Sequence, residues 1–452
     1  LEFCMEPFQL TVKEVVAAIR SRQISPVDLV KSILGRVNNL DSKLKAWTHI
    51  DEDKLLADAY LSEKALQAGE ECRALECVPV GMKDIYFREG FPTTAGSKIY
   101  AEFIPNYDAT TVTLLKRAGA LMMGNTVTTE FACSDPSPTI NPWNSLHTPG
   151  GSSSGSAVAV SSMMCPLAFG SQTVGSVLRP ASYNGVVGFK PTFGRVSRYG
   201  VIPVSWSLDT VGWMTRSVAD AALVLQVVAG RDQNDPVSSN VPINCDGQSR
   251  DEDSSIKVGL VRGYFDVNSD RETRGHINFV AKMIENMGYT VDELDTPESL
   301  EHHLQDQQLI MSVEAATFHQ KLFKERESDY QPKLRKLLAD GLNVNAIDYS
   351  RAQERRRKFI FDMENFARKA DVLLMPSTPT PALADLTNTG DPKFQGPWTS
   401  CGFPAISIPS GVSASGLPFG IQLVAPLFKE RLLLRVAGLI ESALDIRLVP
   451  QL

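Results

Sequence analysis

Three short segments of this 452-residue chain hold side chains that can break a covalent bond. They are the Gly/Ser loop 150–156, the segment 170–181 that carries Ser176, and the segment 80–84 that carries Lys83. Glycines let a backbone approach a ligand closely, and consecutive N–H groups of such a loop can converge on one anion. If Ser176 attacks a carbonyl, four N–H groups are candidates to hold the resulting oxyanion. They belong to Thr173, Val174, Gly175 and Ser176.

A serine hydroxyl is a poor nucleophile until a base takes its proton, so the base must be found elsewhere in the chain. One alternative is histidine, because residues 151–155 have the form G-x-S-x-G with Ser153 as the nucleophile. That motif requires a strand before it, whereas Pro149 and two glycines precede the serines here. Only His147 lies near the loop, and it precedes the serines in the chain. The other candidates lie in helical stretches, for which we expect surface positions: His276, His302, His303 and His319.

Lysine is the second candidate base. Lys83 follows the apolar stretch Val78–Met82, which predicts a short buried strand. Burial would disfavour the ammonium form and lower the pKa of Lys83 into the range that a base needs near neutral pH. Taken alone, however, Lys83 is better interpreted as the partner of Asp84 or of another carboxylate.

Considered together, the three segments resemble the amidase signature family. That family has a Gly-Gly-Ser-Ser loop and a Gly-Gly-Ser-hydrophobic segment leading to Pro-Ala, and Ser152 and Ser176 match the interval between its two catalytic serines. The resemblance is strong over roughly 70–230 and 370–452 and weak over 235–370. The other segments that carry it are 185–192, 194–197, 207–209, 402–405 and 416–422.

The resemblance implies that Lys83 is the base, Ser152 the relay and Ser176 the nucleophile, with a cis peptide bond between Gly151 and Ser152. It further implies hydrolysis of the C–N bond of a small amide through an acyl-enzyme. Aryl amides, carbamates (urethanes) and esters pass through the same oxyanion and are further substrate classes. The alternative within the family is a glutamine-hydrolysing subunit of an amidotransferase complex.

This chain departs from the family pattern at two positions. Gln172 and Val174 stand where the family commonly has Asp and Gly, but neither change removes a reacting group. Three further residues are candidates for substrate contact, namely Ser153, Arg179 and Trp398. Each has a competing interpretation: orientation of the relay for Ser153, a structural hydrogen-bond donor for Arg179, and ordinary packing for Trp398.

Composition narrows the class of partner. A formal net charge of −7 argues against nucleic acid, and no apolar run is long enough to span a membrane. The seven cysteines are odd in number and scattered without a C-x-x-C pair, which favours a reduced cytoplasmic protein without a structural zinc. We therefore expect a small-molecule amide as the partner and no cofactor, metal, membrane or nucleic acid. A homodimer is compatible with these features.

Helical periodicity and short apolar strands alternate along the chain, which predicts the α/β class. Family resemblance implies one amidase domain over 1–452, an α/β/α sandwich around a large mixed β-sheet. Within it we expect N-terminal helices over 1–70 and a signature core over 71–235. A variable, mostly helical cover is expected over 236–370, and a C-terminal part of the core sheet over 371–452. The charged run 355–358 predicts a solvated helix face.

Overall fold

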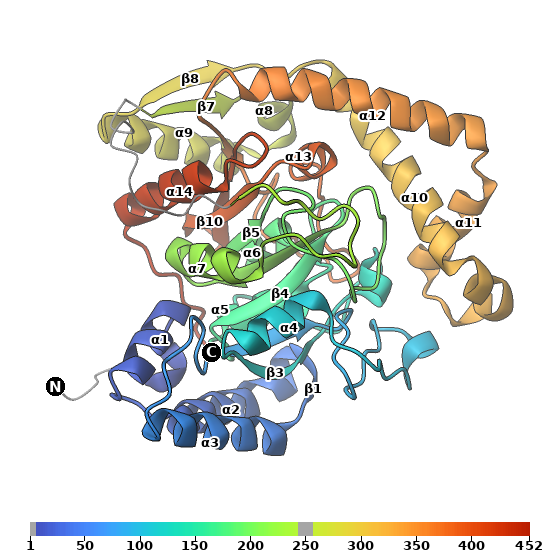
Figure 1. The fold of residues 1–452 in the computed structure, drawn as a ribbon. Helices are drawn as coiled ribbons and strands as arrows, with labels where there is room; N and C mark the ends of the chain where they lie inside the picture. The colour runs from blue at the N-terminus through green and yellow to red at the C-terminus, as the bar shows by residue number, and fades with distance from the viewer. Residues whose placement is uncertain (1–5, 243–255) are drawn as a thin grey trace.

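The computed structural model describes residues 6–242 and 256–452, and within these ranges eleven strands form one mixed sheet (Figure 1). The order of strands across the sheet is β1-β3-β2-β4-β6-β5-β10-β11-β9-β7-β8. The predicted α/β class with a large mixed sheet is therefore confirmed. The strands are β1 (Trp47–Ile50), β2 (Pro79–Lys83), β3 (Leu121–Thr126), β4 (Leu167–Gln172), β5 (Val187–Lys190), β6 (Thr210–Thr215), β7 (Lys257–Val261), β8 (Thr290–Leu294), β9 (Val372–Pro376), β10 (Ala405–Val412) and β11 (Pro418–Val424).

Helices surround this sheet. Among them, α5 packs against β2, β3, β4 and β6, while α6 packs against β5, β10 and β11. The described α-helices are α1 (Val12–Arg20), α2 (Pro26–Leu44), α3 (Glu52–Gln67), α4 (Thr110–Arg117), α5 (Ser154–Ser161), α6 (Leu178–Asn184), α7 (Val218–Val228), α8 (Tyr264–Asn268), α9 (Arg271–Asn286), α10 (Ser299–Arg326), α11 (Pro332–Asn343), α12 (Ala346–Ala367), α13 (Gly396–Cys401) and α14 (Glu430–Leu444).

Local sequence signals explain where several helices begin. The Thr11 side chain accepts the N–H of Glu14 and the Glu14 side chain accepts the N–H of Thr11, which closes a capping box at the start of α1. Ser25 caps α2 and Pro26 is its first residue, since a helix needs no N–H donor there. Every residue of α5 is buried, which its small and apolar composition allows.

Strand pairing brings together the parts of the chain that carry the reactive side chains. Strand β2 lies between β3 and β4 and is parallel to both, with Gly81 opposite Ala168. Parallel strands end at the same edge of a sheet, so Lys83 at the end of β2 and Ser171 near the end of β4 meet at one edge. The loop that follows β4 carries Ser176.

Helix α10 packs against both α11 and α12, and these three helices, drawn from yellow to orange in Figure 1, lie at the outside of the fold. Both α10 and α12 also contact α13, which lies close to the loop after β4. The predicted solvated face of residues 355–358 holds for most of the run, but Arg356 is an exception. Its guanidinium turns inward and donates to the backbone carbonyls of Ser400 and Ser207 over 2.9 Å each. Across the described ranges, no helix combines the length and apolarity needed to cross a bilayer.

Candidate active site

Lys83 is the last residue of β2, and its side chain is fully buried. Its Nζ donates to Ser152 Oγ over 2.6 Å and to Ser171 Oγ over 2.9 Å. Burial lowers the pKa of Lys83 to about 7, with the negative charge of Asp209 acting in the opposite direction. Near neutral pH a large fraction of this side chain is therefore an uncharged amine that can accept a proton.

Ser152 lies in the loop that precedes α5, and the peptide bond Gly151–Ser152 is cis. Two contacts hold this loop in place. Arg179 donates to the carbonyl of Gly151 over 2.6 Å, and the N–H of Ser153 donates to the carbonyl of Ser176 over 3.3 Å. The second contact sets the two Gly/Ser segments side by side. Ser152 is buried whereas Ser176 is partly exposed, so Ser176 is the more accessible of the two residues.

The three residues of the predicted Lys–Ser–Ser constellation thus lie in one region, and one of the two hydrogen bonds that a proton relay through them would need is present. The hydrogen bond from Lys83 to Ser152 is present. Between the hydroxyls of Ser152 and Ser176 none is present among the hydrogen bonds of the described residues. Catalytic hydrogen bonds in free enzymes commonly tighten only when the substrate is in place.

Contacts from helices α10 and α13 orient the loop of residues 173–176. Gln307 of α10 donates to the carbonyl of Thr173 over 3.4 Å, and Thr399 of α13 donates to the carbonyl of Val174 over 2.8 Å. In a trans peptide the carbonyl and the following N–H point in opposite directions. The N–H groups of Val174 and Gly175 are therefore turned away from α10 and α13, where they are free of these two contacts.

The two departures from the family pattern are accommodated locally. The amide oxygen of Gln172 accepts the N–H groups of Val177 and Leu178 over 2.9 and 3.0 Å, at the start of α6. Its Nε2 donates to Thr399 Oγ1 over 2.9 Å, so a neutral amide joins α6 to α13. Val174 is not among the described residues with positive φ, so its β-branched side chain meets no backbone conflict.

Asp209 holds the first residue of this loop. Thr173 Oγ1 donates to Asp209 Oδ1 over 2.6 Å, and the N–H groups of Val204 and Ser205 donate to Asp209 Oδ2 over 2.8 and 2.9 Å. Burial raises the pKa of Asp209, while the hydrogen bonds from Thr173 and the two N–H groups act to lower it. The carboxyl group thus ties segment 204–205 to the loop that carries Ser176.

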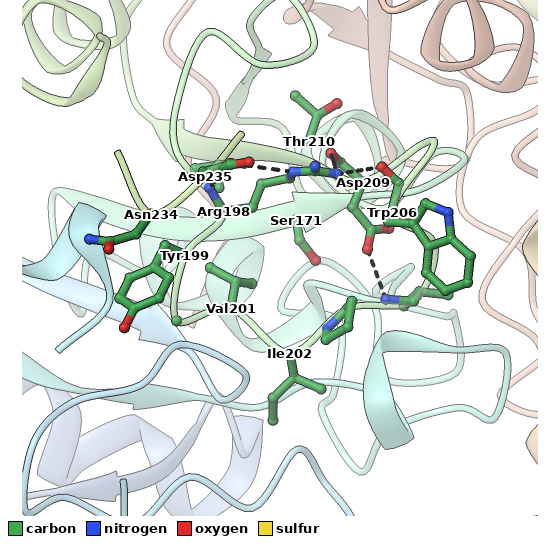
Figure 2. A pocket seen from close by; sticks show the side chains of 14 residues that line it. Ser171, Arg198, Tyr199, Val201, Ile202, Trp206, Asp209, Thr210, Asn234 and Asp235 are labelled. Atoms are coloured by element: carbon green, nitrogen blue, oxygen red, sulfur yellow. Dashed lines mark hydrogen bonds and ion pairs between the residues drawn. The ribbon is translucent and has the colours of Figure 1, made fainter. Parts of the chain in front are cut away.

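A cavity of about 280 Å³ lies next to these residues (Figure 2). Its lining includes Ser171 and Asp209 as polar groups and the half-exposed rings of Tyr199 and Trp206. Neither Ser152 nor Ser176 lines it. A molecule in this cavity would therefore touch Ser171, the second hydrogen-bond partner of Lys83, but not the hydroxyl expected to react.

Ser171 and Asp209 are contacts that reasoning from the sequence missed. Both residues lie within segments that carry the family resemblance, but neither is among the predicted site residues. The available signal for Ser171 was its place near the end of the strand before Ser176, since a parallel neighbour of the Lys83 strand must end at the same edge. The Asp209 contact depends on tertiary structure and left no local signal.

The candidates for substrate contact lie in positions that favour their competing interpretations. The guanidinium of Arg179 is buried and donates to the carbonyls of Gly390 and Gly151 over 2.8 and 2.6 Å, which leaves a carboxylate-anchoring role without support. Trp398 is fully buried and stacks with Phe403 and Phe265. Ser153 is fully buried, and its Oγ accepts the N–H of Ser171 over 3.4 Å.

The histidine alternative receives no geometric support, and one expectation about these residues is wrong. His147 Nδ1 lies 2.7 Å from the carbonyl oxygen of Ala382 and not beside a serine hydroxyl. His303 and His319 were expected at the surface, but both are buried. Burial lowers their pKa values to about 3 and about 4. They pack in aromatic surroundings, where His303 stacks on Phe359 at a centroid distance of 3.8 Å, because the covering helices enclose them.

Comparison with known proteins identifies the family of the chain. The profile of the family described as Amidase matches residues 28–434. One of the subunits of the glutamyl-tRNA(Gln) amidotransferase of Geotalea daltonii (strain DSM 22248 / JCM 15807 / FRC-32) is 34% identical, and the alignment covers 98% of each chain.

Solved structures extend the similarity to the whole fold. The peptide amidase of Stenotrophomonas maltophilia superposes with a TM-score of 0.86 at 27% identity, over 98% of both chains. A 6-aminohexanoate cyclic dimer hydrolase superposes with a TM-score of 0.88 at 25% identity, over 99% of both chains. With a family profile that spans most of its length and a relative that matches it nearly end to end, this chain belongs to the amidase (amidase signature) family.

Proposed function

We propose that this protein hydrolyses an amide C–N bond through an acyl-enzyme on Ser176, with Ser152 as relay and Lys83 as base. The observation that carries the proposal is the buried Lys83 amine, whose Nζ lies 2.6 Å from Ser152 Oγ. Burial supplies the uncharged base, and the short hydrogen bond supplies the first step of a proton path.

In the proposed reaction, Ser176 Oγ attacks the carbonyl carbon while its proton passes through the Ser152 hydroxyl to Lys83 Nζ. The N–H groups of residues 173–176, above all those of Val174 and Gly175, hold the oxyanion of the tetrahedral intermediate. The proton returns along the same path to the leaving nitrogen, because an amine leaves poorly as an anion. Water, activated by the same relay, then hydrolyses the acyl-enzyme.

Glutamine is the first substrate to test. The support is the 34% identity, across almost the whole chain, to a protein named as part of a glutamyl-tRNA(Gln) amidotransferase. In this candidate function, the chain releases ammonia from glutamine as one member of a complex. One contact weighs against it: Arg179, the cation nearest Ser176 in sequence, is engaged by two backbone carbonyls and offers no obvious anchor for the carboxylate of glutamine.

The second candidate is a stand-alone amidase for small amides, aryl amides, carbamates or esters. Its support is the close superposition on a peptide amidase and a cyclic dimer hydrolase. Size-exclusion chromatography together with initial rates on glutamine and on a panel of amides, anilides, carbamates and esters separates the two. Turnover of the panel by the isolated chain supports the second candidate, and glutaminase activity that requires a partner supports the first.

The nucleophile itself is tested by Ser176→Ala. We expect this variant to lose turnover and covalent labelling by a fluorophosphonate, because no other described serine combines partial exposure with a position on this loop. Peptide mass spectrometry of the labelled wild type identifies the modified residue. Labelling that persists in Ser176→Ala on Ser153 would instead support the G-x-S-x-G interpretation.

We also propose that the chain is one domain in which the mostly helical region 236–370 sets substrate choice. The support comes from α10, whose Gln307 contacts the loop of Ser176 directly. Residues 243–255 of this region lie outside the described structure.

A further inference from the structure

Glu314 is a fully buried carboxylate on α10, in the part of the chain that resembles the family least. It accepts hydrogen bonds from Ser205 Oγ over 2.5 Å, from Ser207 Oγ over 2.6 Å and from the N–H of Ser207 over 3.0 Å. Tyr349 of α12 donates to it over 2.8 Å. All of these donors are neutral. A buried carboxylate is costly to desolvate, so its side chain is held firmly by the groups that satisfy it.

The segment that Glu314 holds leads directly to the loop of Ser176. The N–H groups of Val204 and Ser205 donate to Asp209 Oδ2, and Asp209 Oδ1 accepts from Thr173 Oγ1. A continuous set of hydrogen bonds therefore runs from α10 through the segment 204–209 to Thr173, the first residue of the proposed oxyanion loop.

The other side of the same loop is held by the same group of helices. Gln307, two turns before Glu314 on α10, donates to the carbonyl of Thr173. Arg356 of α12 donates to the carbonyls of Ser207 and Ser400, and the latter adjoins Thr399, which holds the carbonyl of Val174. Helices α10 and α12 therefore hold the loop through chains of contacts that end at the side chain of Thr173 and at the backbone carbonyls of Thr173 and Val174.

We propose that Glu314 is a positioning residue that sets the orientation of the oxyanion loop through Ser205, Asp209 and Thr173. This inference rests on the proposed function of Ser176 and adds a residue of the variable region to it. Trp206, between the two serines that Glu314 holds, lies in the wall of the cavity shown in Figure 2 and is placed by the same contacts.

The test compares Glu314→Gln and Glu314→Ala with Glu325→Ala, which removes an exposed carboxylate from the same helix. We expect kcat to fall about tenfold in Glu314→Gln, which retains one acceptor oxygen, and about 100-fold in Glu314→Ala, with KM changed by less than about threefold. Glu325→Ala should match the wild type. A wild-type kcat in a folded Glu314→Gln variant would overturn the proposal, as would a change confined to KM.

A double-mutant cycle separates positioning from general destabilisation. Thr173→Val removes the hydroxyl that donates to Asp209. If Glu314 acts through this hydroxyl, adding Glu314→Gln to Thr173→Val lowers kcat by less than about twofold further, whereas independent effects would multiply. Multiplying effects would overturn the proposal.

The rate of fluorophosphonate labelling provides a readout that needs no substrate. Labelling of Ser176 should be slower in Glu314→Gln than in the wild type by the same factor as kcat. If the wild type is labelled at Ser176 and Glu314→Gln is labelled at the same rate, the role of Glu314 is overturned and the proposed function stands. A wild type that is not labelled at Ser176 overturns the proposed function, and with it the inference that rests on it.

Discussion

Two buried lysines show why burial alone does not identify a base. Burial lowers the pKa of both Lys83 and Lys190 to about 7. Lys190 Nζ donates to the carbonyl of Pro191 over 2.9 Å, whereas Lys83 Nζ lies between the hydroxyls of Ser152 and Ser171. A hydroxyl can hand its proton to the amine and a carbonyl cannot, so the surroundings of Lys83 and not its pKa distinguish it.

The pH dependence of activity should follow Lys83. The ammonium form cannot accept a proton, so below a pKa of about 7 the value of kcat/KM should fall about tenfold per pH unit, and above it the value should level off. Initial rates from pH 5.5 to 9 on one amide substrate provide the measurement. Lys190→Met is the matched control and should keep the same ascending limb. Lys83 would not be the base if the rise of kcat/KM with pH disappeared in Lys190→Met. A wild-type kcat/KM that stays constant from pH 6 to 9 would contradict this role as well.

At the scale of elements, the sequence could predict what depends on neighbours along the chain. The capping box of α1 and the Ser25-Pro26 start of α2 are local signals of this kind. The order of strands in the sheet could not be predicted from the sequence, because strand pairing joins segments that are far apart in the chain. For example, β10 and β11 lie between β5 and β9. The residues proposed to react were predicted from a family resemblance, while the contacts of Ser171, Asp209 and Glu314 arise only when such distant segments meet.

Glycines within helices give a prediction at this scale. A methyl group added at Gly35 of α2 or at Gly275 of α9 would meet no atom within 4 Å, and neither residue has positive φ. We expect Gly35→Ala and Gly275→Ala each to raise the free energy of unfolding by about 0.5–1 kcal/mol, since alanine has less backbone freedom to lose.

Gly341 of α11 is the contrasting case. A methyl group there would overlap the backbone carbonyl of Ser312, so Gly341→Ala should lower the free energy of unfolding by forcing α11 away from α10. Urea denaturation followed by circular dichroism measures all three variants. Equal effects of Gly341→Ala and Gly35→Ala would show that the close approach of α10 and α11 is not tight in solution.

At the scale of the whole molecule, the last part of the chain completes the sheet that the middle part begins. Strand β10 pairs antiparallel with β5, and β11 pairs with β9. The C-terminal helix α14 begins at Glu430, whose carboxylate meets Arg195 from the segment after β5. These connections favour a single cooperative domain, since removing the C-terminal strands would expose the edge of β5.

The ion pair between Arg195 and Glu430 tests that connection. The two side chains are 2% and 3% exposed, with Arg195 Nη2 3.0 Å from Glu430 Oε2 and a second hydrogen bond of 3.2 Å from Nε to Oε1. Glu430→Gln leaves the guanidinium buried without a counter-charge, which should cost about 3–5 kcal/mol of unfolding free energy. Asp340→Asn, in the exposed pair with Lys336, should cost less than about 1 kcal/mol.

The effect of Glu430→Gln should also depend on pH. Burial acts to raise the pKa of Glu430, but the hydrogen bonds from Arg195 and Thr192 and the charge of Arg195 outweigh it, so the pKa lies below its usual value. The carboxylate therefore stabilises the folded state fully above the unfolded pKa of about 4.3, and this contribution is lost as the pH falls through the lower folded value. Denaturation midpoints of the wild type and Glu430→Gln should differ most near neutral pH and converge in acid. A difference that stays constant from pH 7 to pH 3 would mean that packing, and not the charge of Glu430, joins α14 to the core.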